Sequence, residues 1–236
     1  MFFKKSKKEL YLEKKEIPFA ALMVLLDILA IISLMFGLSK TNSANASLIG
    51  NFELAATTIV SVLVFREKIS KKLLVSIALI TIAGIILTFE GSSSFYFNFY
   101  SIFVFLSCVF WGMENNCTRL LSIKDTRIIT AIKGVFSGLG CLIIACLLKK
   151  AVFSLEFVLP SMLLGFFSYG LSVSLYIFSQ RYLGASKTSA YFSSAPFFGV
   201  VFSFLFLSQE LGICFYIGLI IMIISYYLVI KDTMDS

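Results

Sequence analysis

Four charged residues of this chain lie inside long apolar stretches of the sequence. They are Asp27, Glu53, Glu114 and Lys133. Ionised groups among apolar residues are costly to bury, so they usually face the interior of a helix bundle and are candidates for function by default. Because burial disfavours the charged form of a carboxylate, acids in this position are suited to binding and releasing protons.

Glu53 belongs to a row of small and polar residues that recur at spacings of three or four positions. The row consists of Ala46, Gly50, Glu53, Thr57 and Ser61. Residues at these spacings share one face of an α-helix. Two interpretations stay open. The face lines a cavity, which we favour, or its small residues let two helices pack closely, with Glu53 hydrogen-bonded across the contact. Asn51, two positions before Glu53, is a further candidate for contact with a substrate.

A second polar group closes the stretch 99–118, in the sequence WGMENNCTR. Helical spacing places Ser107, Trp111, Glu114 and Thr118 on one face, with Asn115 and Asn116 on the adjoining faces. Such a run is hard to reconcile with a surface that faces lipid. The alternative is that the helix has already reached the membrane interface, where Trp and polar residues are common. We give the two interpretations equal weight.

A third polar row lies in the stretch 157–179. It consists of Ser168, Ser172, Tyr176 and Ser179. Hydroxyl groups at helical spacing bind neighbouring helices in membrane proteins. We therefore favour helix–helix hydrogen bonding over substrate contact for this row.

The composition places these residues in a membrane protein. Hydrophobic residues make up 59% of the chain and charged residues 14%, against roughly half and a quarter in soluble domains. Apolar stretches of about 20 residues, enough to cross a bilayer, lie near 17–38, 43–65, 73–89, 99–118, 128–148, 157–179, 188–207 and 212–230. Backbone polar groups in lipid must be satisfied within the segment, so each stretch is predicted to be a helix. The sequence therefore predicts an all-α bundle of about eight spans.

The distribution of positive charge predicts the orientation. If the basic segment 1–16 is cytoplasmic, 17 of the 20 Lys and Arg residues fall in inside loops or at inside helix ends. This satisfies the positive-inside rule and places both termini in the cytoplasm. The net charge of +7 is thereby explained by membrane topology, and we expect no nucleic-acid partner.

Several chemistries are excluded by the residues that are missing. The chain has no histidine, so neither a Ser-His-Asp site nor a histidine-bearing zinc site can form. It has no phosphate-binding loop of the G-x-x-x-x-G-K-[ST] type, so it does not contain its own ATPase. Its five cysteines fall in the predicted spans without metal-type spacing. We expect no enzyme activity, no metal and no cofactor.

The chain contains an internal repeat. Residues 43–87 are echoed by residues 186–230, each copy running from small and polar residues through an apolar stretch to an acid, Glu67 or Glu210. Ser193 and Pro196 occupy the positions that correspond to Gly50 and Glu53. The two copies begin with the second and seventh spans, five helices apart, so they cross the membrane in opposite directions. An inverted repeat around a site at the membrane midplane is typical of secondary transporters, and a proline there frees a backbone carbonyl.

The sequence resembles the EamA family of the drug/metabolite transporter superfamily. The resemblance lies in Asn45–Glu53 (NASLIGNFE), Arg66–Ile69 (REKI), Trp111–Arg119 (WGMENNCTR), Tyr169–Ser174, Leu183–Ala190 (LGASKTSA) and Ala195–Gly199 (APFFG). It implies ten helices in two inverted repeats of five, a central cavity that opens alternately to either side, and a place in the cell membrane.

The chain departs from this family pattern in its first repeat. It has three predicted spans before the break at Gly91–Ser94 where the family has five. The first two helices are therefore expected to be missing, through a truncated gene, a misplaced start codon, or because the protein works only as a homodimer.

Together these observations predict a secondary transporter of a small metabolite, with proton coupling as one option. The alternative is a truncated or non-transporting membrane protein that needs a partner chain. The expected parts are a cytoplasmic segment 1–16, a partial repeat 17–90, a complete repeat 95–231 and a cytoplasmic tail 232–236. The expected partners are the lipid bilayer and a small-molecule substrate. The candidates for the substrate or proton pathway are Asp27, Asn51, Glu53, Trp111, Glu114, Asn115, Lys133, Ser193 and Pro196.

Overall fold

The protein folds as an all-α bundle, as expected. The structure is a computed structural model that describes residues 11–40, 49–50, 52–89, 99–195, 198, 201–202, 205 and 213–235. These residues contain no β-strand. The helices are α2 (Ile17–Leu38), α4 (Phe52–Leu63), α5 (Lys71–Phe89), α6 (Phe99–Leu121), α7 (Thr126–Leu147), α8 (Leu155–Leu164), the π-helical turn η1 (Gly165–Leu171), α9 (Ser172–Phe192) and α11 (Ile213–Met234).

Four helical stretches in the described part of the chain are long and apolar enough to cross a membrane. They are α2, α7, the joined stretch Leu155–Phe192 and α11, and α4 is a shorter apolar helix. The polar run at residues 114–116 lowers the hydropathy of α6. The class of fold is thus confirmed, whereas the number of eight spans stays a prediction.

Local sequence explains several helix ends. Pro18 occupies the first turn of α2, where its missing N–H would have no helical partner anyway. Asp125 caps α7, and its carboxylate accepts a hydrogen bond from the backbone N–H of Arg127 at 3.0 Å. This cap satisfies one of the free donors that every helix start leaves.

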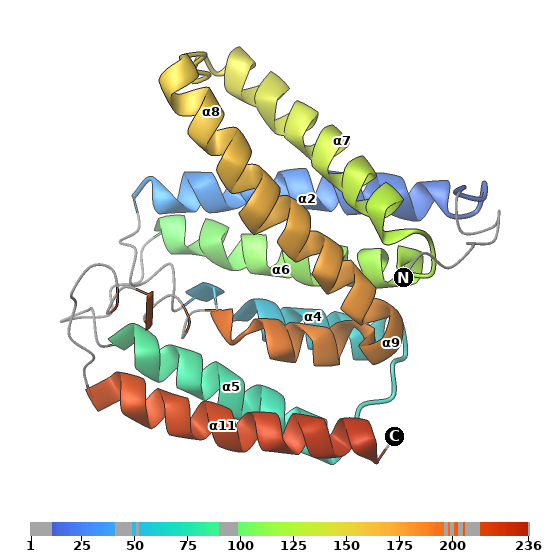
Figure 1. The fold of residues 1–236 in the computed structure, drawn as a ribbon, viewed down its shortest axis with the longest axis vertical. Coiled ribbons are helices and arrows are strands. Elements are labelled where there is room, and N and C mark those ends of the chain that lie inside the picture. The colour runs from blue at the N-terminus through green and yellow to red at the C-terminus, as the bar shows by residue number, and fades with distance from the viewer. Residues whose placement is uncertain are drawn as a thin grey trace.

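The helices pack around α6 (Figure 1). α2 lies along one side of α6 and α4 along the other, while α5 and α11 form a pair beyond α4. α7, α8, η1 and the first part of α9 cross these helices obliquely, and the last part of α9 (orange) runs back alongside α4. A core cluster of Met23 and Leu26 from α2, Leu121 from α6, Ile129 from α7 and Ile177 from α9 joins them. α6 can therefore present side chains to α2, α4, α7 and α9 at once.

The two spans expected at 157–179 and 188–207 are not separated by a loop. The helical path runs from Leu155 to Phe192 and bends sharply at Gly184, which has φ 79° and ψ 176°. Only glycine adopts this backbone conformation readily. The chain therefore changes direction at a single residue, and this residue lies between the two stretches that were predicted as separate spans.

The bend at Gly184 is held by the connection between α4 and α5. The Ser186 hydroxyl donates to the Glu67 carboxylate at 3.4 Å, just after the bend. Burial here raises the pKa of Glu67, and the nearby Arg119 guanidinium opposes that rise. One residue further, Lys187 forms an ion pair with Asp232 of α11 at 2.9 Å. This end of the bundle is thus closed by polar contacts between elements that are distant in sequence.

Candidate functional site

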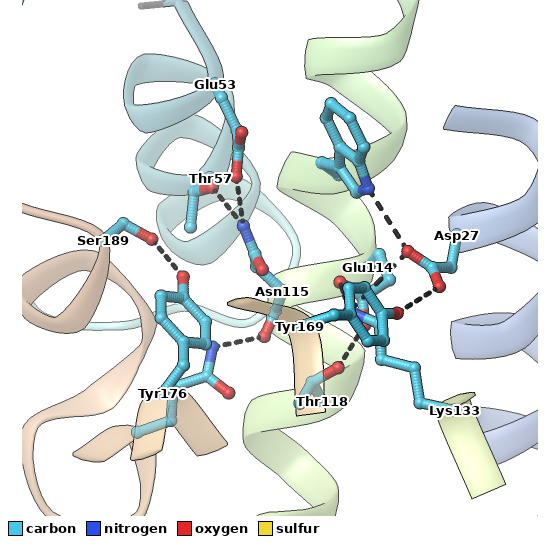
Figure 2. A network of polar contacts seen from close by, with 12 residues as sticks. Asp27, Glu53, Thr57, Glu114, Asn115, Thr118, Lys133, Tyr169, Tyr176 and Ser189 are labelled. Atoms are coloured by element: carbon cyan, nitrogen blue, oxygen red, sulfur yellow. Dashed lines mark hydrogen bonds and ion pairs between the residues drawn. The ribbon is translucent and has the colours of Figure 1, made fainter. Parts of the chain in front are cut away.

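An ion cluster joins α2, α6 and α7 in the middle of the bundle. Lys133 lies 3.0 Å from a Glu114 carboxylate oxygen and 3.7 Å from an Asp27 carboxylate oxygen. The side chain of Lys133 is 8% exposed and those of Asp27 and Glu114 are 1% exposed. Figure 2 shows the three side chains converging beside α6. A charged group this deeply buried needs an opposite partner, and here one cation serves two acids.

Neutral donors complete the environment of the two acids. Trp111 donates its indole N–H to Asp27 at 3.2 Å, and the Tyr169 hydroxyl donates to the other oxygen of Asp27 at 2.9 Å. The Thr118 hydroxyl donates to Glu114. The Lys133 ammonium also lies 5.9 Å from the centre of the Tyr169 ring, a favourable cation–π distance. Four elements of the fold thus hold one ion cluster.

A second polar cluster surrounds Glu53 on the other side of α6. The Asn115 amide donates to Glu53 at 3.1 Å and to the Thr57 hydroxyl at 3.2 Å. The Gln180 amide of α9 donates to the backbone carbonyl of Asn115 at 2.9 Å. Asn116 binds the backbone carbonyl of Thr57 at 2.9 Å. The consecutive residues Asn115 and Asn116 therefore hold α6 against α4 by hydrogen bonds. Asn115 also links this helix contact to α9.

Both clusters border one cavity of about 260 Å³. Six of the nine sequence candidates line it: Asp27, Glu53, Trp111, Glu114, Asn115 and Lys133. Tyr176 and Phe192 form another part of the wall, their rings 5.2 Å apart and edge-on. The Tyr176 hydroxyl is hydrogen-bonded to Ser189 at 2.6 Å. A concave site with apolar walls and a few converging polar groups is the usual form of a small-molecule site.

The other three candidates lie elsewhere. Ser193 directly follows the last residue of α9, and its hydroxyl donates to the backbone carbonyl of Ser189 at 2.8 Å. It does not line the cavity. Asn51 and Pro196 lie outside the described residues, so their part in the site stays a prediction.

Burial shows where the residues with two open interpretations lie in the bundle. Glu114 and Asn116 are fully buried, and Asn115 is 6% exposed. The polar end of α6 therefore faces the interior of the bundle, and its depth in the membrane stays a prediction. The Glu53 face divides in two: Glu53 borders the cavity, whereas Thr57 and Ser61 are buried, and Thr57 packs against α6.

Sequence reasoning missed part of the cavity wall. Ser168, Ser172 and Tyr176 line the cavity, although we had favoured helix–helix hydrogen bonding for that row. Tyr169 was not singled out as a candidate. It lies in η1, a π-helical turn, which changes the direction of its side chains relative to an α-helix. Such turns are frequent at functional sites, but a search for spacings of three and four residues does not find them.

The described residues bring no three His, Cys, Asp or Glu side chains together in a way that could hold a metal ion. The contacts that the described side chains make in the site are ion pairs, hydrogen bonds and aromatic contacts.

The comparisons with known proteins identify the family. The sequence profile of the EamA-like transporter family matches residues 1–89 and 98–231. The chain belongs to that family. Together with the apolar helices, this makes it a multi-pass membrane protein of a transporter family.

Two individual proteins resemble this EamA-like chain. An uncharacterized transporter of Methanothermobacter thermautotrophicus is 28% identical over 232 residues, which are 95% of this chain and 68% of that protein. A protein of known crystal structure superposes with a TM-score of 0.71 at 10% sequence identity, covering 92% of this chain and 88% of the other. At that identity the second likeness shows the fold alone.

Proposed function

We propose that this chain is a secondary transporter that moves a small metabolite through the central cavity by alternating access, coupled to protons. The observation that carries the proposal is the cavity itself. Three carboxylates and one lysine from α2, α4, α6 and α7 meet in the interior of a membrane helix bundle. Intramembrane charges are rare, and they mark substrate and ion pathways where they occur.

The proposed architecture has two repeats, 17–90 and 95–231, related by inversion. The end of the bundle that holds Glu67, Gly184 and Lys187 would face the cytoplasm of a cell-membrane protein, with both termini on that side. This placement rests on the concentration of Lys and Arg at that end. In the orientation described, contacts such as Ser186 with Glu67 must break when the cavity opens to the cytoplasm.

In the proposed proton-coupled step, Asp27 and Glu114 compete for the ammonium group of Lys133. With both acids ionised, Lys133 is held between Glu114 and Asp27. Protonation of either acid removes one of the two attractions, so the ammonium moves toward the other. Because α2 and α7 are connected by this contact, a proton can change how the two helices pack. Glu53, which has amide and hydroxyl neighbours, offers a second protonation site beside the substrate space.

The test is uptake into proteoliposomes under an imposed pH gradient, with a panel of radiolabelled cationic, anionic and neutral metabolites. For any compound that the wild-type protein accumulates, we expect Glu53→Gln and Glu114→Gln each to abolish the dependence on pH. Glutamine keeps the size of glutamate but cannot exchange a proton. Glu156→Gln, on the exposed surface of α8, is the matched control and should leave uptake unchanged. If both cavity variants kept the pH dependence of the wild type, the proton role would be wrong.

A partner chain is the second candidate, and one observation favours it. α8 and η1 contain no buried residue, so lipid or another protein must cover them. A homodimer that completes the bundle through this face would fit. Crosslinking in the native membrane, with cysteines placed on α8, would detect it.

A further inference from the structure

The charges around the cavity do not balance. Asp27, Glu53 and Glu114 carry three formal negative charges, and Lys133 carries one positive charge. Lys133 forms ion pairs with Asp27 and Glu114. Among the described residues, no Lys or Arg lies within salt-bridge distance of Glu53. When all three acids are ionised, the cavity therefore has an excess of negative charge, and Glu53 is the acid without a Lys or Arg partner among the described residues.

We propose that the cavity binds an organic cation, an aromatic or arylalkyl amine whose ammonium group pairs with Glu53. This inference rests on the proposed function, because it names the class of substrate for the same cavity. The carboxylate of Glu53 is held toward the cavity by one hydrogen bond from Asn115 at 3.1 Å. An ionised carboxylate accepts several such bonds, so positions remain for the donors of an ammonium group.

The walls next to Glu53 suit the aromatic part of such a molecule. Tyr176 and Phe192 line the central cavity, and both also line a second cavity of about 660 Å³ between the two parts of the bent helix. Phe198 and Phe202 contribute to that second cavity. Aromatic faces attract a cation at close range and stack on an aromatic ring. The two cavities therefore share Tyr176 and Phe192 as a common wall, which offers an aromatic surface to a bound ligand.

The same arrangement opposes an anionic substrate. An anion would have to pair with Lys133, which already lies against two carboxylates and is 8% exposed on its side chain. Taking Lys133 away from them would leave those acids buried without a partner, a costly arrangement. A carboxylate in the cavity would also meet the negative charge of Glu53. Repulsion of this kind is a usual source of selectivity.

Three probes of the same shape test the charge preference directly: phenethylamine, phenylacetate and 2-phenylethanol. Each is added to the purified full chain in detergent at pH 7, and the melting temperature is measured against concentration. A ligand that binds the folded state raises this temperature in proportion to the logarithm of its concentration once the site is filled. We expect the increase with phenethylamine only. Stabilisation by phenylacetate or 2-phenylethanol to the same degree, or by none of the three, would overturn the inference.

Variants locate the effect at Glu53. We expect Glu53→Gln to weaken phenethylamine binding at least tenfold, because the ammonium loses its charged partner. Glu156→Gln on α8 changes the net charge by the same amount outside the cavity and should bind like the wild type. If Glu53→Gln kept the wild-type affinity, the ammonium would not be bound at that residue and the proposal would fail.

The binding test addresses the cation site and the transport test addresses the proposed function, so either can be contradicted without the other. Phenethylamine that binds through Glu53 but is not accumulated in proteoliposomes supports the cation site and contradicts transport. Accumulation of an anion or a neutral metabolite without binding of phenethylamine supports transport and contradicts the cation site.

Discussion

Replacing Lys133 with methionine is expected to lower the free energy of unfolding by about 3–5 kcal/mol. Lys133 is the cation shared by Asp27 and Glu114, at 3.7 and 3.0 Å. Methionine fills a similar volume but leaves two buried carboxylates without that partner. The loss should appear in thermal or denaturant unfolding of the purified protein.

Two further variants show whether charge is the cause. The triple change Lys133→Met, Asp27→Asn and Glu114→Gln removes the whole ion cluster and should recover most of the lost stability, because neutral groups are less costly to bury. Lys72→Met breaks an exposed ion pair with Asp235 and should cost no more than about 1 kcal/mol. A Lys133→Met protein as stable as the Lys72→Met protein would contradict our description of the cluster.

Gly112→Ala should destabilise the protein by about 3 kcal/mol and weaken the contact between α4 and α6 that positions Glu53. A Cβ atom added at Gly112 would lie 2.8 Å from the backbone of Ala56 and Thr57 in α4. Backbone atoms cannot move aside alone, so α4 and α6 must separate. The Asn115 to Glu53 hydrogen bond crosses the same contact, and we expect phenethylamine affinity to fall together with stability.

Gly134→Ala is the control for that change. A Cβ atom at Gly134 in α7 meets nothing within 4 Å, and alanine is favoured over glycine in a helix by roughly 0.5–1 kcal/mol. Gly134→Ala should therefore be neutral or stabilising. Equal stability of the two alanine variants would show that α4 and α6 are not in close contact at Gly112.

The acids of the site could be predicted because charge inside an apolar stretch is visible without a structure. Asp27, Glu53, Glu114 and Lys133 were each found in this way, and all four border the cavity. Helical spacing alone also placed Trp111 beside Glu114. The ion pairs between these residues could not be predicted from the sequence. Lys133 is shared by two acids because of the way in which α7 crosses α2 and α6.

The aromatic wall and the bend were harder to predict. Tyr169 contacts Asp27 from a π-helical turn, and no residue pattern marked that turn. Gly184 could be recognised as a glycine that ends a helix, but its φ of 79° and the absence of a loop after it follow from tertiary packing against Glu67. Both features come from contacts between segments distant in sequence, which periodicity does not record.

The central claim is that one cavity opens to each side of the membrane in turn, and cysteine labelling tests it without knowledge of the substrate. Ser172 lines both cavities, and Ser172→Cys is nearly isosteric. It is placed in a protein whose five cysteines are replaced by alanine. Ser225→Cys is the control, because Ser225 is fully buried and bonded to the Ser76 carbonyl at 2.7 Å.

A membrane-impermeant methanethiosulfonate is applied to right-side-out and to inside-out vesicles. We expect Ser172→Cys to be labelled from both sides, more slowly when phenethylamine is present, and Ser225→Cys to be labelled from neither. Labelling of Ser172→Cys from one side only, or from no side, would contradict alternating access.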